Sequence, residues 1–262
     1  MKQAFRNAVQ SSLGKFGVGL VRLETQARNA KARTDLEFLR AMPSAATAQV
    51  LQNFDKSQAQ LRQDLFVLAQ LGFKRGGYFV EFGAANGIYL SNTYLLEKEF
   101  GWTGILAEPA RSWQSALASN RSAAIESRCV WSRSAASLTF NEVDNPELST
   151  IDSFSGSDAH RKARTAGTTY EVKTISLNDL LREHSAPAEI DYLSIDTEGS
   201  EFEILEAFDF SRHRFRVITC EHNFTPAREK IAALLGPHGY TRKYPAISQW
   251  DDWYVHEGQD SR

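Results

Sequence analysis

Residues 79 to 87 of this 262-residue chain read Phe-Val-Glu-Phe-Gly-Ala-Ala-Asn-Gly, and they constrain the fold more than any other stretch. A short apolar run ends at a turn that contains Gly83 and Gly87, and a segment of helical character follows. Glycine lets the backbone approach a ligand closely, and the N-terminus of a following helix offers free N–H groups. A strand, turn and helix in this order are typical of a site for a nucleotide-like ligand.

The glycine spacing narrows the choice of ligand. Dinucleotide-binding turns carry three glycines at G-x-G-x-x-G spacing, and the middle one makes room for a pyrophosphate. Here Gly83 is followed by Ala84 and Ala85, and the next glycine is Gly87. The missing glycine favours a cofactor without phosphates, and a tight turn that binds no ligand is the simpler alternative.

From about residue 60 onward, helical and strand-like segments alternate along the chain. This alternation predicts an α/β fold with a mainly parallel sheet wound on both faces. The expected strands cover residues 78–82, 104–107, 127–131, 137–141, 190–195 and 216–220, and a terminal hairpin is expected over 240–244 and 253–256. The expected helices cover residues 61–71, 89–100, 113–120, 177–183, 202–207 and 228–235.

Residues 1–58 differ from the rest of the chain, so we expect a helical N-terminal extension followed by a single domain over 59–262. The extension is rich in Ala, Gln, Arg and Lys and poor in strand formers. Its partly apolar stretch, Val18, Leu20, Val21 and Leu23, lies among basic residues. One interpretation is a helix that contacts a membrane surface or a partner protein. The simpler one is a solvated helix packed on the main domain.

Composition excludes several classes of function. A net charge of −2 gives no electrostatic reason to expect nucleic acid as a partner. No apolar run is long enough to span a bilayer, and no signal-peptide pattern opens the chain. Cys129 and Cys220 fall in or beside expected interior strands, so we expect reduced core thiols and a cytoplasmic protein.

Polar residues follow the ends of the expected strands, where open α/β sheets bind their ligands. Glu81 precedes the glycine turn, and Glu108 lies about twenty residues beyond that turn, where a carboxylate reaches a ribose diol. Glu108 next to Pro109 could instead cap a helix. The other polar residues at strand ends are Ser132, Asp196, Glu198, Glu221, His222 and Asn223.

Asp196, Glu198, Glu221 and His222 are the candidates for chemistry. His222 has a side chain suited to general-base catalysis near neutral pH, and Asp196 and Glu198 are the carboxylate candidates. The three carboxylates and the imidazole could together hold Mg²⁺ or Mn²⁺. The alternatives are structural: Glu198 or Glu201 capping the next helix, and His222 bonded within the sheet edge.

Two further groups suggest contacts with an acceptor molecule. Residues 144–170 read as a long mobile loop whose bases could contact an anionic acceptor, and a solvated loop is the alternative. These bases are His160, Arg161, Lys162 and Arg164. The stretch Trp250, Asp251, Asp252 and Trp253 could wall a sugar ring, or Trp253 could simply pack in the core.

Three strings together resemble the FkbM-type S-adenosylmethionine-dependent methyltransferases. They are the stretch from Val80 through Ser91 and Thr93 to Pro109, the stretch Ile190–Glu201, and the stretch Val217–Asn223. The resemblance covers about residues 58–256, with Gln63 and Asp64 fitting the same group. It implies a class I methyltransferase fold: a doubly wound, Rossmann-like sheet of seven strands, mainly parallel, with an antiparallel strand from the C-terminal hairpin.

The resemblance also implies S-adenosylmethionine as cofactor and a small-molecule or glycan hydroxyl as acceptor. Carried onto this chain, the residues that would border the cofactor are Glu81, Gly83, Ala84, Gly87, Asn92, Glu108, Pro109, Cys129, Val130, Ser132 and Asp196. Two other classes share some features: an NAD-dependent oxidoreductase or epimerase, and a non-catalytic scaffold that keeps the cofactor fold. The missing G-x-G-x-x-G and the absence of a Tyr-x-x-x-Lys motif disfavour the first, and the intact strand-end acids disfavour the second.

Overall fold

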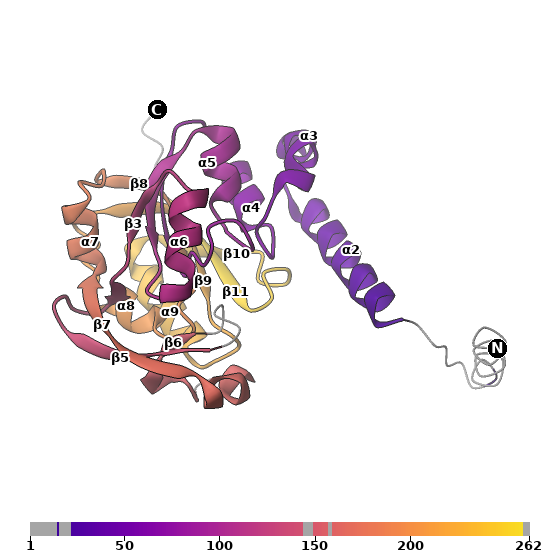
Figure 1. The fold of residues 1–262 in the computed structure, drawn as a ribbon. Coiled ribbons are helices and arrows are strands. Elements are labelled where there is room, and N and C mark those ends of the chain that lie inside the picture. The colour runs from indigo at the N-terminus through magenta and orange to yellow at the C-terminus, as the bar shows by residue number, and fades with distance from the viewer. Residues whose placement is uncertain (1–14, 16–21, 144–148, 157–158, 259–262) are drawn as a thin grey trace. The chain divides into compact units, whose positions relative to one another are not determined.

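The computed structural model of the protein describes residues 15, 22–143, 149–156 and 159–258. The chain divides into two units, Met1–Ala41 and Met42–Arg262. The first unit contains helix α2, Leu23–Ala41, which carries ion pairs one turn apart, such as Arg33 with Glu37 at 2.9 Å (Figure 1). Val18, Leu20 and Val21 of the apolar stretch lie outside the described residues. No helix in the described part of the chain is long and apolar enough to cross a membrane.

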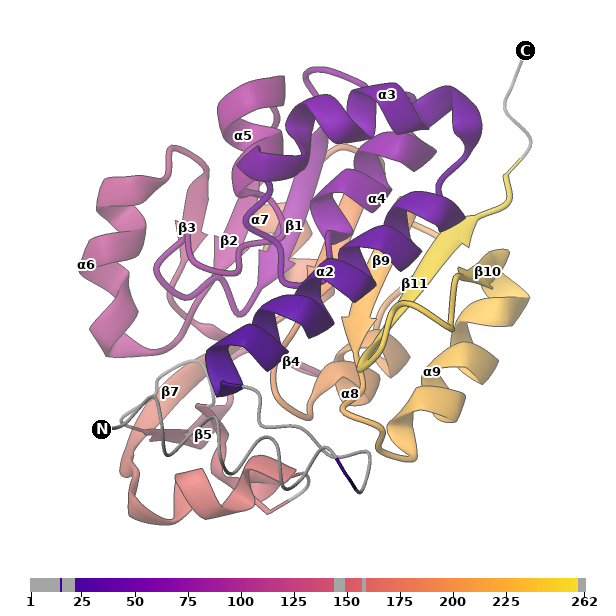
Figure 2. The ribbon, with the colours of Figure 1, turned by 90° about the vertical axis from the view of Figure 1, so that its right-hand side faces the viewer.

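The second unit is built on a seven-stranded sheet in the order β10-β11-β9-β8-β1-β2-β3. Its strands are β1 Tyr78–Phe82, β2 Thr103–Ala107, β3 Ala124–Glu126, β8 Glu189–Ile195, β9 Arg214–Glu221, β10 Tyr240–Lys243 and β11 Asp251–His256. Strand β11 runs antiparallel to both of its neighbours, and the other pairings are parallel (Figure 2). The predicted architecture, a doubly wound and mainly parallel sheet of seven strands with an antiparallel strand from the C-terminal hairpin, is confirmed.

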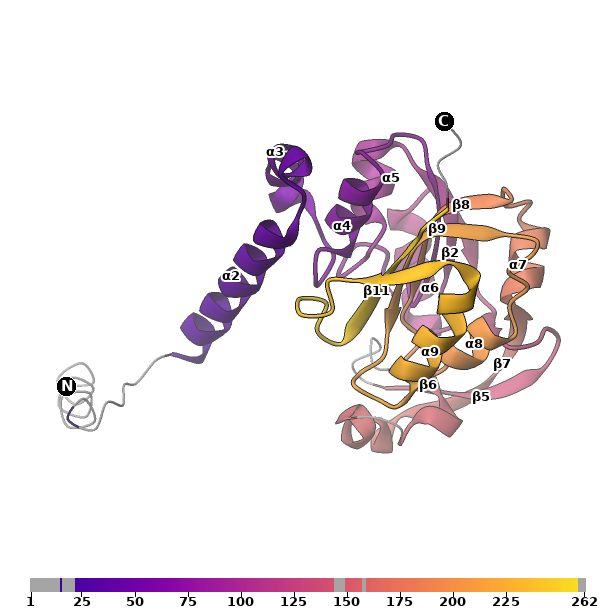
Figure 3. The same ribbon diagram turned by 180° about the vertical axis from the view of Figure 1, so that it is seen from behind.

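Helices cover both faces of this sheet, as the alternating pattern predicted. Helices α7 Leu177–Glu183, α8 Glu201–Glu206 and α9 Ala227–Leu235 pack on the face that carries Val80 and Phe82. Helix α6, Arg111–Asn120, lies in front of the sheet in Figure 1, whereas the view from behind in Figure 3 brings α9 to the front. Other helical segments of this unit are α3 Ser44–Asn53, α4 Gln63–Gln70, α5 Tyr94–Phe100, η1 Phe54–Lys56 and η5 Gly236–His238.

A smaller sheet in the order β4-β7-β5-β6 accounts for the main departures from the sequence prediction. Its strands are β4 Cys129–Trp131, β5 Ser137–Glu142, β6 Thr150–Ile151 and β7 Thr168–Ser176. The single strand predicted over 127–131 is wrong: β3 ends at Glu126 in the large sheet, and β4 starts at Cys129 in the small one. The ion pair between Arg128 and Glu126, at 2.6 Å, marks the break between them.

The long loop predicted over 144–170 is also largely structured where it is described. Residues 150–151 form β6, and the segment also contains the short helices η3 Asp152–Phe154 and η4 Ala159–Ala166. Strand β7 then pairs with β5 over six residues. Polar composition concealed this order because one face of β5 and β7 is exposed, which leaves Ser, Thr and Glu on the strands.

The helix predicted over 89–100 begins only at Tyr94. Residues before it form an irregular turn in which Leu90 has a φ of +59°, and Asn86 Oδ1 accepts hydrogen bonds from the backbone of Ile88 and Tyr89. An asparagine side chain that bonds its own downstream backbone competes with helix formation. The turn that follows β1 is therefore longer than the sequence indicated.

Candidate functional site

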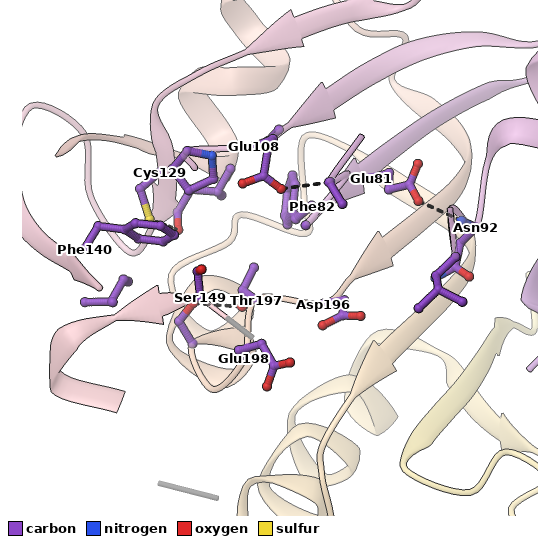
Figure 4. Close-up of a pocket in the computed structure, with 18 of the residues that line it drawn as sticks. Glu81, Phe82, Asn92, Glu108, Cys129, Phe140, Ser149, Asp196, Thr197 and Glu198 are labelled. Atoms are coloured by element: carbon purple, nitrogen blue, oxygen red, sulfur yellow. Dashed lines mark hydrogen bonds between the residues drawn. The ribbon is translucent and has the colours of Figure 1, made fainter. Parts of the chain in front are cut away.

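A pocket lies at the carboxyl ends of β1, β2 and β8, the edge of the sheet where the sequence predicted a ligand (Figure 4). Its empty space, counted out into the solvent at the open mouth, is about 870 Å³. Strands β4, β5 and β6 of the smaller sheet supply one wall. In Figure 4, Cys129 and Phe140 lie at one end of the pocket, and Glu81 and Asn92 lie at the other.

The charges on the pocket wall are of one sign. Four carboxylates line it, from Glu81, Glu108, Asp196 and Glu198. None of the described residues that line it is a lysine, arginine or histidine. The wall therefore favours a cationic or neutral ligand and offers no basic side chain for a pyrophosphate.

The glycines of the turn after β1 allow other chain segments to come close to the backbone of this turn. Gly83 has a φ of +74°, and a Cβ on it would lie 2.0 Å from the backbone oxygen of Asp196 at the end of β8. Gly87 has a φ of +80°, and its Cβ would lie 2.6 Å from Cγ of Arg121. Gly83 lines the pocket, whereas Gly87 and Ala84, both expected at the cofactor, are not on its wall; Ala85 is.

Glu81 is the centre of a buried hydrogen-bond network. Its carboxylate accepts hydrogen bonds from the hydroxyls of Ser91 and Thr93 and from the backbone N–H of Asn92, the last at 2.7 Å. The guanidinium of Arg121, fully buried, lies 3.7 Å from it. Glu81 thus organises the turn that carries Asn92. The side chain of Asn92 donates to Ser194 at 2.9 Å. Glu81 and Asn92 both line the pocket.

Glu108 ends β2 and points across the pocket. One carboxylate oxygen accepts from the backbone N–H of Ala85 at 2.9 Å, and the other accepts from that of Ala110 at 2.8 Å. Burial outweighs these hydrogen bonds and raises the pKa of Glu108 to about 7. Each oxygen keeps a lone pair for a further donor, so the carboxylate can accept from a ligand's hydroxyl groups once it is ionised.

The far end of the pocket is apolar. Cys129 and Val130, both predicted at the cofactor, line it together with Phe140 and Ile151 of the smaller sheet. Pro109 also lines it, but Ser132 does not. Burial raises the pKa of Cys129 to about 12, and both cysteines are free and buried, so neither is a reactive thiolate.

Three carboxylates converge where β8 and β9 end. One oxygen from each of Asp196, Glu198 and Glu221 lies within 4.8 Å of the others. Burial, followed by the neighbouring charge of Asp251, raises the pKa of Asp196, and burial and Asp196 itself raise that of Glu221. Two carboxyl groups this close favour holding a proton or a cation between them over both being bare anions. One oxygen of Glu221 is buried and has no hydrogen-bond partner among the described residues.

The structure does not bring His222 to these carboxylates, so its predicted roles as base and metal ligand are corrected. Its Nδ1 accepts from the backbone N–H of Phe224 at 3.0 Å, and its Nε2 lies 3.8 Å from Asp252. Strand β9 ends at Glu221, and His222, which follows it, faces Phe224 and Asp252 instead. Burial lowers the pKa of His222 and so favours its neutral form.

The turn after β8 is capped by Glu201. One oxygen of Glu201 accepts from the backbone N–H groups of Thr197 and Gly199, at 2.9 and 3.0 Å. This frees Glu198 from the capping role that sequence left open to either residue. Glu198 instead has a φ of +58° and lines the pocket.

The two groups expected to contact an acceptor lie elsewhere. Arg164 is buried and pairs with Glu198 at 2.8 Å, while Arg161 and Lys162 are exposed; nothing is described of the His160 side chain. Trp253 is buried and stacks on Phe66, with ring centroids 4.7 Å apart. Asp251 and Asp252 are buried too and bond to partners within the fold, so these two acids and Trp253 do not form a wall for a sugar.

Several pocket residues were not among those predicted from the sequence. Ala85, Tyr89, Phe140, Ser149, Thr197 and Ser200 line the pocket. Thr197 and Ser200 follow a strand end that was recognised, so their neighbourhood pointed to them. Phe140 and Ser149 reach the site only because the smaller sheet folds against the strand ends, which no local pattern indicates.

Comparison with known proteins gives the family. The model of the methyltransferase FkbM domain matches residues 81–258. No curated protein matches the chain. Among solved structures, it is similar to the methyltransferase FkbM from Methylobacillus flagellatus KT, at 11% identity, covering 86% of this chain and 59% of that one, with a TM-score of 0.41. It is also similar to the precorrin-6y C5,15-methyltransferase from Geobacter metallireducens GS-15, at 12% identity, covering 69% of this chain and 71% of that one, with a TM-score of 0.36.

Proposed function

The chain belongs to the FkbM methyltransferase domain family, and on that premise we propose that it transfers the methyl group of S-adenosylmethionine to a hydroxyl group of a glycan or another small molecule. The observation that carries this proposal is the pocket wall, with four carboxylates and, among the described residues that line it, no basic side chain. S-adenosylmethionine suits such a wall because it carries a sulfonium and an ammonium and lacks phosphate. The charge of an NAD pyrophosphate would be opposed there.

The donor half of the proposed site lies between Glu108 and the apolar end. Glu108, once ionised, would accept from the two ribose hydroxyls while its backbone partners Ala85 and Ala110 hold it in place. Cys129, Val130 and Phe140 offer an apolar slot of the kind that an adenine ring fills. Glu81 would act indirectly, by fixing the turn that carries Asn92.

The acceptor half lies at Asp196. Methyl transfer needs an acceptor oxygen aligned behind the methyl group, and alignment can contribute roughly 7–11 kcal/mol in ideal cases. A positioned base adds about 10²–10⁴-fold. Asp196 lines the pocket across from Glu108 and faces Glu221, so its carboxylate can take the proton of an acceptor hydroxyl (Figure 4).

A divalent cation is part of this proposal. Asp196, Glu198 and Glu221 offer only oxygen donors, which Mg²⁺ and Mn²⁺ prefer, and one Glu221 oxygen is buried with no hydrogen-bond partner in the described part of the chain. These three residues would hold the ion, which when bound lowers the pKa of a hydroxyl beside it. If the site works this way, exhaustive chelation abolishes methyl transfer and Mn²⁺ restores it. Full activity in the chelated protein would remove the cation from the mechanism.

The activity itself is tested with S-adenosylmethionine that carries a tritiated methyl group. The acceptor source is an extract of the source organism in which the gene has been deleted. We expect label to enter a glycan or metabolite fraction with the wild-type protein and to fall at least 100-fold with Asp196→Asn, because the aligned base is lost. No transfer by either protein, with the sulfur ligand bound, would favour a non-catalytic scaffold.

A further inference from the structure

The turn that follows β8 is held by side chains from elements far away in the sequence. Thr150 of β6 is fully buried, and its hydroxyl lies 3.0 Å from the backbone oxygen of Glu198 and 3.3 Å from that of Thr197. Arg164 of η4 donates from Nη2 to Oε2 of Glu198 at 2.8 Å. Asn223, which follows β9, reaches the same oxygen at 3.3 Å.

The backbone at Glu198 is in a conformation that a glutamate seldom adopts. Its φ is +58°, in the left-handed region, and Gly199 follows at +124°. Strain of this kind persists where surrounding contacts over-determine the conformation, and it concentrates at functional sites. Here the contacts from Thr150, Arg164 and Asn223 hold the backbone of Glu198 in this conformation.

The pair between Arg164 and Glu198 is buried on both sides. Their side chains are 0% and 8% exposed. Taking two such charges out of water costs about as much free energy as their attraction returns, so a buried ion pair adds little to stability. It does fix the position of one side chain relative to the other. The guanidinium also places a positive charge beside a group of three carboxylates.

We propose that Arg164 is a positioning residue: its guanidinium holds the Glu198 carboxylate beside Asp196 and Glu221, where the acceptor hydroxyl is oriented. This inference rests on the proposed methyl transfer. It gives Thr150 and Arg164 a role in holding the acceptor half of the site rather than in covering it. The backbone partners of the Glu108 carboxylate are Ala85 and Ala110, so the cofactor half is held by other contacts.

The test compares Arg164→Gln with Arg161→Gln, an exposed arginine on the same short helix. Loss of a residue that orients a site ligand typically lowers activity about 10–100-fold. We expect that loss in methyl transfer to the deletion-strain extract with Arg164→Gln, affinity for S-adenosylhomocysteine within twofold of wild type, and no change with Arg161→Gln. The variant Arg164→Lys keeps the charge and should recover part of the activity, which also covers the case in which Arg164→Gln does not fold.

A double-mutant cycle separates action through Glu198 from a general structural role. If Arg164 acts through Glu198, the double variant Arg164→Gln, Glu198→Gln loses no more activity than Glu198→Gln alone. Losses that multiply, or an Arg164→Gln variant as active as Arg161→Gln, would overturn the inference. Failure of the wild-type protein to bind S-adenosylhomocysteine would instead overturn the proposed function, so the two failures are distinguishable.

Discussion

Glu108 is the residue on which the donor half of the site depends. Its two oxygens are each held by one backbone N–H, and the remaining lone pairs face the pocket. In Glu108→Gln the side chain keeps its size but loses its charge and one acceptor. A hydrogen bond to a charged group contributes roughly 1.5–3 kcal/mol, so affinity for S-adenosylhomocysteine should fall about 10–100-fold by calorimetry. The exposed Glu99→Gln is the matched control, and equal affinity in both variants would contradict the ribose role.

The raised pKa of Glu108 makes a second prediction at this scale. The free protein holds this carboxyl half protonated at about pH 7, and only the ionised form accepts from both ribose hydroxyls. Affinity for S-adenosylhomocysteine should therefore rise with pH, by about tenfold between pH 6 and pH 8. In Glu108→Gln this dependence should disappear. A wild-type affinity that is flat or falls over this range would show that Glu108 does not bind as a carboxylate.

Gly83 and Gly101 illustrate two different reasons why a position requires glycine: a left-handed backbone conformation and the close approach of another chain segment. Both have a positive φ, but only at Gly83 would a Cβ strike backbone, 2.0 Å from the Asp196 oxygen; at Gly101 nothing lies within 4 Å. Gly101→Ala should lower the free energy of unfolding by about 1–2 kcal/mol, the cost of the left-handed conformation. Gly83→Ala should lower it by more than about 4 kcal/mol in denaturant titrations. Equal losses would mean that the strand ends do not need this close approach.

At the scale of residues, chain order predicted the place of Glu108 and Asp196 on the pocket wall: Glu108 from its distance beyond the glycine turn, and Asp196 from its position after a strand. Their roles stay predictions. Arg164 was misread because its partner Glu198 lies 34 residues away, and the sequence gives no sign of that contact. His222 was misassigned because its ring faces the backbone of Phe224 and the carboxylate of Asp252, contacts that its place directly after β9 does not reveal.

At the scale of elements, the contact of β6 with the turn after β8 carries the site's acceptor half. Thr150→Val keeps the shape of the side chain but leaves the buried carbonyls of Thr197 and Glu198 without this donor. The free energy of unfolding should fall by about 1–3 kcal/mol. Thr139→Val, which removes an exposed hydroxyl bonded to Glu171, is the control and should change it by less than about 0.5 kcal/mol. A Thr150→Val protein as stable as the control would show that this contact contributes nothing.

The large sheet was predictable because its strands are apolar runs that end at polar turns. Strand β1 and helix α7 have the bounds that the sequence predicted. The smaller sheet was not, since β7 has an exposed face and its partner strand β4 follows β3 after two residues. A chain that leaves one sheet and enters another within two residues looks like one continuous strand in a pattern of hydrophobic residues.

At the scale of the whole molecule, the described pocket lies entirely within the second unit, residues 42–262. A protein that begins at Met42 should therefore bind S-adenosylhomocysteine with the affinity of the full chain. The boundary expected from sequence, at 58, would also remove α3, which packs against α4. A protein that begins at residue 59 should be less stable to heat than one that begins at Met42. Loss of binding in the protein that begins at Met42 would assign residues 1–41 to the site.

The central claim is that an acidic pocket at the strand ends holds the methyl donor. Its most direct test is calorimetric titration of the full-length protein with S-adenosylhomocysteine and, separately, with NAD. The account predicts saturable binding of the sulfur ligand, lost or weakened in Glu108→Gln, and no measurable binding of NAD. Binding of NAD with no response to S-adenosylhomocysteine would contradict it.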